Sequence, residues 1–134
     1  MSDAAIPVTL AGKVYHLRYT YPDFKLMEET LKMGFKHFIE PEIFPTMTAQ
    51  GVFLWCGLKK EIQENGRWVH VFPQTEEGLE QACALLWDHV TATGIPAEVS
   101  NAIFDAFTTT GPWKKATHQT PEPKGKKKPK NLKT

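Results

Sequence analysis

The stretch IPVTLAGKVYHLRYTYPD, residues 6–23, decides how the chain begins to fold. Its apolar residues are spaced for two short strands, the first over residues 8–10 and the second over residues 14–19. Between them, Ala11-Gly12 offers a tight turn in which the glycine can adopt positive φ. The sequence therefore predicts a β-hairpin at the N-terminus.

A first helix should begin directly after this hairpin. Thr20 followed three residues later by Asp23 resembles a capping box, and Pro22 is tolerated in a first helical turn. The apolar residues that share one face of this helix are Phe24, Met27 and Leu31. Gly34 stands where a C′ glycine would end the helix.

The middle of the chain is apolar throughout but is broken by prolines. Residues 35–45 predict a short helical turn and a packed loop, because they contain two prolines among large apolar residues. The run from Thr46 to Gln63 carries a wide apolar stripe and should be the most buried helix. Asn65-Gly66 then marks a turn, and residues 68–72 predict a short extended segment.

Two further amphipathic helices complete the pattern. Thr75 is a suitable N-cap followed by two glutamates, and apolar residues recur at helical spacing until Gly94. Pro96 fits the first position of a last helix, which ends in the breaker at residues 108–112. The sum is an α+β fold, dominated by helix: an N-terminal β-hairpin followed by about four helices.

Charge divides the chain into two parts. Residues 1–113 have a net charge of −6, whereas residues 114–134 carry eight lysines against one glutamate, a net charge of +7. The second part has few large apolar side chains, so we predict a folded domain over 1–113 and a disordered Lys/Pro-rich tail over 114–134. No apolar run is long enough to cross a membrane and the N-terminus lacks the features of a signal peptide, which predicts a cytoplasmic protein.

Candidate catalytic and metal-binding residues do not form a recognisable site. The five histidines are His16, His37, His70, His89 and His118. None is placed with another histidine or with a cysteine at zinc-ligand spacing, so we expect no metal and no cofactor. Cys56 and Cys83 lie in apolar runs and should be reduced, buried thiols. The adjacent glutamates at 28–29 and 76–77 are not a converging pair, and Gly125-Lys126-Lys127 lacks a phosphate-binding loop, so we predict that the protein is not an enzyme.

Two stretches resemble a known family. The first runs Val8-Thr9-Leu10-Ala11-Gly12-Lys13, then Tyr15 and Leu17-Arg18-Tyr19-Thr20, then Leu26, Glu28-Glu29 and Gly34. The second is Leu54-Trp55-Cys56-Gly57-Leu58. Together they are similar to phage tail assembly chaperones and their relatives in gene transfer agents. The loop at residues 41–45 and the lysine-rich tail depart from the short gene-transfer-agent form.

This resemblance implies a non-enzymatic protein that is absent from the finished virion. It would bind the tape measure protein and keep it soluble while tail tube subunits assemble around it in the host cytoplasm. The tail tube protein itself is a second candidate partner. Two alternatives stay open: a small nucleic-acid-associated adaptor that uses the basic tail on phosphates, and a structural component of the tail. Apolar stripes on several helices also leave open a homo-oligomer.

Candidate partner contacts come from two sets of residues. Trp68, Phe72 and Trp113 fall at element edges outside the helical stripes, where they either contact a partner or cap the core. The basic candidates are Lys114, Lys115, Lys126, Lys127 and Lys128. These lysines suit an acidic protein surface or the phosphates of a nucleic acid.

Overall fold

The computed structural model describes residues 5–62 and 67–110, and its chain begins with the predicted hairpin. Strands β1 (Ile6–Leu10) and β2 (Lys13–Leu17) pair antiparallel along their whole length. Ala11 and Gly12 between them both have positive φ, 55° and 75°, as a two-residue type I′ turn requires. The hairpin prediction is confirmed.

Two more strands extend the hairpin into a sheet. β3 (Leu58–Ile62) pairs with β2 on one side and with β4 (Arg67–His70) on the other, so the antiparallel order is β1-β2-β3-β4. β4 confirms the predicted extended segment for residues 68–70, whereas residues 71 and 72 lie beyond the strand. The contact between the two hairpins is short, because β2 and β3 share only the pairs His16 with Lys59 and Leu17 with Leu58.

The most buried helix is shorter than the sequence predicts. Helix α2 (Met47–Gly57) is buried along nearly its whole length, but it ends at Gly57 and the chain enters β3 with no loop, so the prediction of a helix through Gln63 was wrong. The ring of Tyr19 lies against Gly57, where an added Cβ would come within 2.4 Å of it. Pairing with β2 and β4 thus decides the conformation of residues that would otherwise suit a helix.

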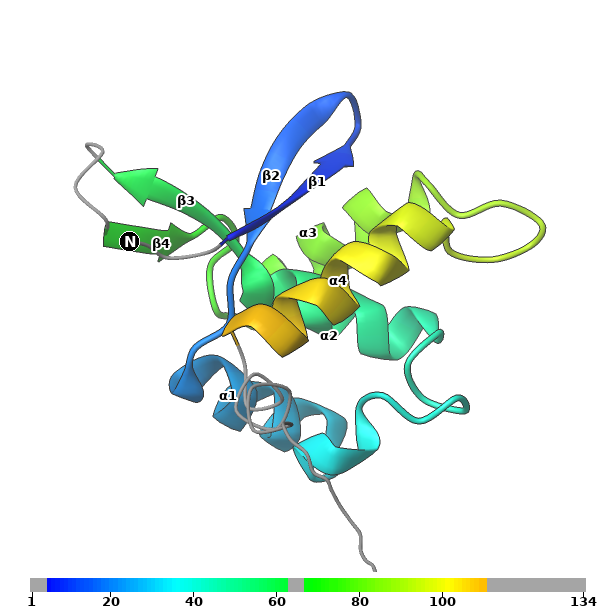
Figure 1. Cartoon of the computed structure of the whole chain (residues 1–134), viewed down its shortest axis with the longest axis horizontal. Coiled ribbons are helices and arrows are strands. Elements are labelled where there is room, and N and C mark those ends of the chain that lie inside the picture. The colour runs from blue at the N-terminus through cyan, green and yellow to red at the C-terminus, as the bar shows by residue number, and fades with distance from the viewer. Residues whose placement is uncertain (1–4, 63–66, 111–134) are drawn as a thin grey trace, which may run out of the picture.

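Four α-helices and one short 3-10 helix lie in the described ranges. Besides α2 they are α1 (Tyr21–Leu31), η1 (Phe35–His37), α3 (Glu76–Trp87) and α4 (Ala97–Thr110). α2 occupies the centre, α1 and α3 pack against it, and α4 crosses in front of it and also packs against β1 (Figure 1). The α+β fold with an N-terminal hairpin is confirmed, and none of these helices has the length and apolar character to cross a lipid bilayer.

Three predicted helix ends are displaced. α1 ends with Lys32 in the left-handed conformation (φ 59°), and Gly34 is not its C′ residue. α3 ends at Trp87, well before Gly94. α4 begins at Ala97, so Pro96 precedes the helix and its carbonyl accepts the first backbone hydrogen bonds. In each case the backbone hydrogen bonds, and not the glycine or proline in the sequence, decide at which residue the helix begins or ends.

Aromatic rings join the helices in the core. Phe107 of α4 lies 5.0 Å from Phe53 of α2 and 4.9 Å from Tyr19, both measured between ring centroids and both in edge-to-face geometry. Phe24 of α1 stacks on Phe38 at 6.3 Å. Rings from α1, α2 and α4 thus meet in one aromatic cluster.

Candidate partner-binding pocket

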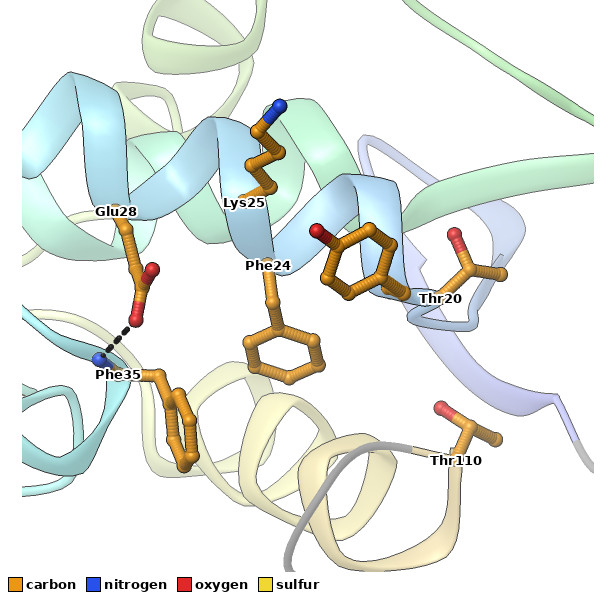
Figure 2. Close-up of a pocket in the computed structure, with 7 residues that line it drawn as sticks. Thr20, Phe24, Lys25, Glu28, Phe35 and Thr110 are labelled. Atoms are coloured by element: carbon orange, nitrogen blue, oxygen red, sulfur yellow. Dashed lines mark hydrogen bonds between the residues drawn. The ribbon is translucent and has the colours of Figure 1, made fainter.

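A surface pocket of about 490 Å³ lies where α1 and the end of α4 come together. Its described lining consists of Thr20, Tyr21, Phe24, Lys25, Glu28, Phe35 and Thr110. Figure 2 shows Phe35 at one end, Thr20 and Thr110 at the other, and the ring of Phe24 between them. The walls therefore come from residues 20–35 and from Thr110, which is 75 positions further along the chain.

One face of α1 supplies most of the lining. Tyr21, Phe24, Lys25 and Glu28 follow the spacing i, i+3, i+4 and i+7, which places them along one side of a helix. Phe24 is nearly buried because its ring lies 5.6 Å from that of Phe107 beneath it. Tyr21, in contrast, is 77% exposed at the rim. The pocket thus has an aromatic floor, an aromatic rim and a mixed pair of charges.

A polar contact places Phe35 at the pocket. The Glu28 carboxylate accepts a hydrogen bond of 2.8 Å from the backbone N–H of Phe35 (Figure 2). The left-handed Lys32 turns the chain back so that this contact can form, and the Glu28 carbonyl accepts from the N–H of Lys32 at 2.8 Å. As a result the Phe35 ring lies 6.2 Å from that of Phe24 and remains 39% exposed.

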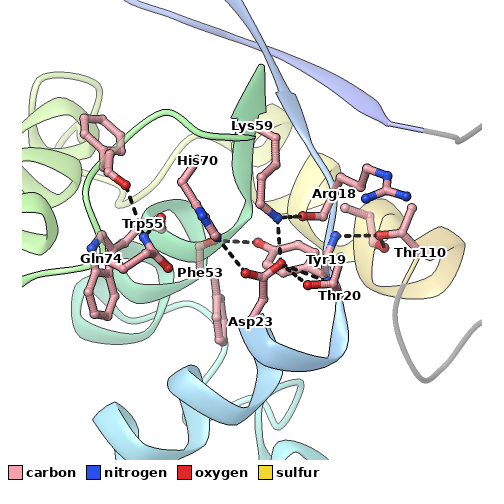
Figure 3. A network of polar contacts seen from close by, with 12 residues as sticks. Arg18, Tyr19, Thr20, Asp23, Phe53, Trp55, Lys59, His70, Gln74 and Thr110 are labelled. Carbon is pink, nitrogen blue, oxygen red and sulfur yellow. Dashed lines mark hydrogen bonds and ion pairs between the residues drawn. The ribbon is translucent and has the colours of Figure 1, made fainter. Parts of the chain in front are cut away.

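A buried polar network holds the start of α1 behind the pocket. Asp23 is 2% exposed, and its carboxylate lies 2.6 Å from the Lys59 ammonium and 2.8 Å from Nε2 of His70 (Figure 3). It also accepts a hydrogen bond of 2.9 Å from the Thr20 N–H, which is the predicted capping-box contact. A carboxylate only accepts, so Nε2 of His70 carries the proton in this contact. Lys59 donates a second bond, of 2.6 Å, to the carbonyl of Arg18.

The two charges of this network have different environments. Burial raises the pKa of the Asp23 carboxyl, but the hydrogen bonds from His70, Lys59 and Thr20 and the charge of Lys59 outweigh it, so the pKa lies below its usual value. Burial lowers the pKa of the Lys59 ammonium, and Asp23 offsets only part of this decrease. The network therefore stabilises the carboxylate more than it stabilises the ammonium.

Tyr19 fixes the end of α4 at the pocket. Its hydroxyl donates to the Phe53 carbonyl at 2.7 Å, and burial raises the pKa of this hydroxyl well above its usual value. Its backbone N–H donates to Oγ1 of Thr110 at 2.9 Å, while the Thr110 hydroxyl donates to the Ala106 carbonyl at 2.8 Å. The last described residue of the chain is thereby held beside the start of α1.

Two of the predicted contact residues lie away from this pocket. Trp68 is half-buried on β4, with its ring 6.1 Å from that of His16, and its indole nitrogen is buried without a hydrogen-bond partner. Phe72 is half-buried against the core. Neither lines the pocket. The remaining predicted residues, Trp113, Lys114, Lys115, Lys126, Lys127 and Lys128, lie outside the described residues, as do the predicted tail and the Asn65-Gly66 turn.

Sequence reasoning missed Tyr21 and Phe35 as candidate contacts. Phe24 was assigned to the core face of its helix, which is correct but incomplete, because one edge of its ring also forms the floor of the pocket. The available signal was the spacing of Tyr21, Phe24 and Glu28 on one helical face.

The described residues contain no group of three histidine, cysteine or acidic side chains that could hold a metal ion. Cys56 and Cys83 are free thiols, and burial raises the pKa of both. Comparison of the chain with protein-family models, with curated proteins and with solved structures finds no match. The geometry of the pocket and the resemblance of the two sequence stretches are therefore the basis for a function.

Proposed function

We propose that this chain is a non-enzymatic phage tail assembly chaperone that binds the tape measure protein and helps the tail tube assemble around it in the host cytoplasm. The proposal takes its partner from the resemblance of residues 8–34 and 52–58 to that family. It takes its binding site from the pocket between α1 and the end of α4. The aromatic pocket is the observation that carries the proposal.

The pocket suits one large apolar side chain presented by a helix. Phe24 forms an apolar floor, Tyr21 and Phe35 flank it, and Lys25 and Glu28 lie on the same face of α1. An amphipathic helix typically binds a protein groove through apolar anchors, with charged residues beside them. Lys25 and Glu28 could then pair with acidic and basic side chains of the partner helix on either side of its apolar anchor. A long helical protein offers many such anchors.

The size of the site predicts reversible binding. Burial of one large apolar side chain contributes about 1.5–3 kcal/mol, and the association must also overcome the loss of translational and rotational freedom. A pocket that takes a single anchor therefore gives modest affinity for each contact. A chaperone that must leave before the tube closes around the tape measure needs this property.

The test is co-expression of the tape measure protein with the full chain, followed by recovery of the complex and measurement of the soluble fraction of the partner. We expect Phe35→Ala to reduce recovery several-fold. Phe104→Ala is the matched control, because Phe104 is similarly exposed (43%, against 39% for Phe35) but does not line the pocket. Equal recovery with both variants would remove the pocket from the proposal.

Other outcomes of the same preparation would favour the alternatives. Recovery of DNA that is lost at high salt, without the tape measure protein, would favour the nucleic-acid adaptor. Presence of the chain in purified particles would favour a structural component of the tail. In either case the chaperone proposal would fail.

A further inference from the structure

The described chain ends at the pocket itself. Thr110 is the last residue of α4 and lines the pocket, and the Tyr19 N–H holds its hydroxyl in place at 2.9 Å. The next residues in the sequence are Gly111, Pro112 and Trp113. A large aromatic side chain therefore follows three positions after a residue of the pocket wall.

We propose that the indole of Trp113 docks in this pocket, as a contact of the tail with its own domain. Three residues span at most about 10 Å, so Trp113 cannot move far from a pocket that Thr110 already lines. A contact so close in sequence also has a high effective concentration, because the connecting segment is short. The occupant is thus a named residue of this chain, and its reach is limited to this part of the surface.

The sequence between Thr110 and Trp113 suits a change of direction. Pro112 lacks a backbone N–H, and a proline disfavours helical conformation for the residue before it. A glycine such as Gly111 has no Cβ, so the conformations of a sharp turn are open to it. The chain can therefore leave the axis of α4 and present the indole to the pocket beside it.

The chemistry of the pocket fits an indole. Phe24 and Phe35 lie 6.2 Å apart in edge-to-face geometry, and aromatic rings prefer such tilted arrangements around one another. Thr20, Glu28 and Thr110 bring oxygen atoms to the lining, which can accept a hydrogen bond from the indole N–H. Lys114 and Lys115 follow Trp113 directly, and their charge suits a domain with a net charge of −6.

Docking would regulate the binding site of the proposed function, and only this regulatory part rests on that function. An apolar anchor of the partner must displace Trp113, so the apparent affinity falls by the fraction of time the pocket is open. If Trp113 occupies the pocket about nine-tenths of the time, its removal tightens binding about tenfold. The tail would then select partners that present a strong anchor.

The first test is fluorine NMR on the full chain labelled with fluorotryptophan. The four tryptophans include two internal references, since Trp55 is buried and Trp87 is 63% exposed. Each resonance is assigned by a Trp→Phe variant. We expect the solvent isotope shift of Trp113 to resemble that of Trp55. A shift equal to that of Trp87 would overturn the docking.

The second test asks whether this pocket is the docking site. Phe35→Ala should move the Trp113 resonance toward the exposed reference, whereas Phe104→Ala should leave it unchanged. If Phe35→Ala does not fold, Tyr21→Ala takes its place, because Tyr21 is 77% exposed and contributes little to the core. A Trp113 resonance that stays buried in Phe35→Ala and Tyr21→Ala would place the indole elsewhere and overturn the proposal.

A binding measurement separates this proposal from the proposed function. With the apolar dye anilinonaphthalene sulfonate as probe, Trp113→Ala should bind about tenfold more tightly than the wild type. Unchanged dye affinity would overturn the docking. A docked Trp113 together with failure to recover the tape measure protein would leave the contact in place and remove the partner. An exposed Trp113 together with recovery of the tape measure protein would overturn the docking and leave the proposed function in place.

Discussion

The first turn of α1 has two sides with opposite character. Asp23 faces the sheet and is 2% exposed, with Lys59, His70 and Thr20 all contacting its carboxylate. Tyr21, two residues earlier, faces outward and is 77% exposed at the rim of the pocket. The comparison teaches that one helical turn can anchor the fold with polar contacts on one side and offer an apolar surface on the other. Variants on the two sides should therefore differ in stability and in binding.

The largest effect on stability is expected from Asp23→Ala. This change leaves the buried Lys59 ammonium without its carboxylate, and loss of one partner of a buried ion pair costs about 3–5 kcal/mol. Urea unfolding followed by circular dichroism measures the loss. Lys59→Met should cost less, because Asp23 keeps its contacts with His70 and Thr20. A larger loss in Lys59→Met than in Asp23→Ala would contradict the view that the carboxylate is the centre of this network.

A smaller loss is expected from Gly57→Ala, at the junction of α2 and β3. The new methyl group would meet the ring of Tyr19, which cannot move without losing its hydrogen bond to Phe53. Overpacking of this kind typically costs about 1–3 kcal/mol. Gly34→Ala is the control, because its nearest contact lies at 3.9 Å and its stability should stay within about 0.5 kcal/mol of the wild type. Similar unfolding midpoints for the two variants would show that Tyr19 adapts.

The pH dependence of unfolding gives a third test of the polar side. The pKa of Asp23 is lowered in the folded state, so its contribution is complete at neutral pH, above the unfolded value of about 3.9. As the pH falls below about 5, the unfolded state takes up the proton first and the contribution is lost. Asp23→Asn should therefore lose less stability than the wild type over this acid range. Parallel stability curves for the two proteins would show that another carboxyl group dominates.

The smallest effect on stability is expected on the open side. Tyr21→Ala should change the free energy of unfolding by no more than about 0.5 kcal/mol, since most of the side chain is in water. Under the proposed function, the same variant should also weaken recovery of the tape measure protein, as is expected of Phe35→Ala. A large loss of stability in Tyr21→Ala would show that the rim of the pocket belongs to the core.

The contacts that the sequence predicted correctly are local ones. The hairpin turn at Ala11-Gly12 and the capping box of Thr20 and Asp23 depend on residues within a few positions of one another. The same capping motif concealed the wider role of Asp23, because Lys59 and His70 lie 36 and 47 positions away. No local pattern indicates that a capping carboxylate will also hold a buried lysine.

The errors share a physical cause, which is that tertiary contacts override local preference. Residues 58–62 suit a helix by composition, yet pairing on both sides makes them the third strand of the sheet. The strand before residue 63 was assigned to the preceding helix, because its residues continue the apolar run of α2. The pocket could not be predicted either, because its walls come from α1, η1 and the end of α4.

The short pairing between β2 and β3, which joins the two hairpins, has a consequence for how the chain folds. Each hairpin joins strands that are neighbours in sequence, whereas His16 with Lys59 and Leu17 with Leu58 close a loop of about forty residues. Local pairs form early, and pairs that close long loops form later. We therefore expect α1 and α2 to collapse first and to bring the hairpins together last. The backbone amides of the residues that pair β2 with β3 would then be protected only in the fully folded protein, and their hydrogen exchange would follow global unfolding.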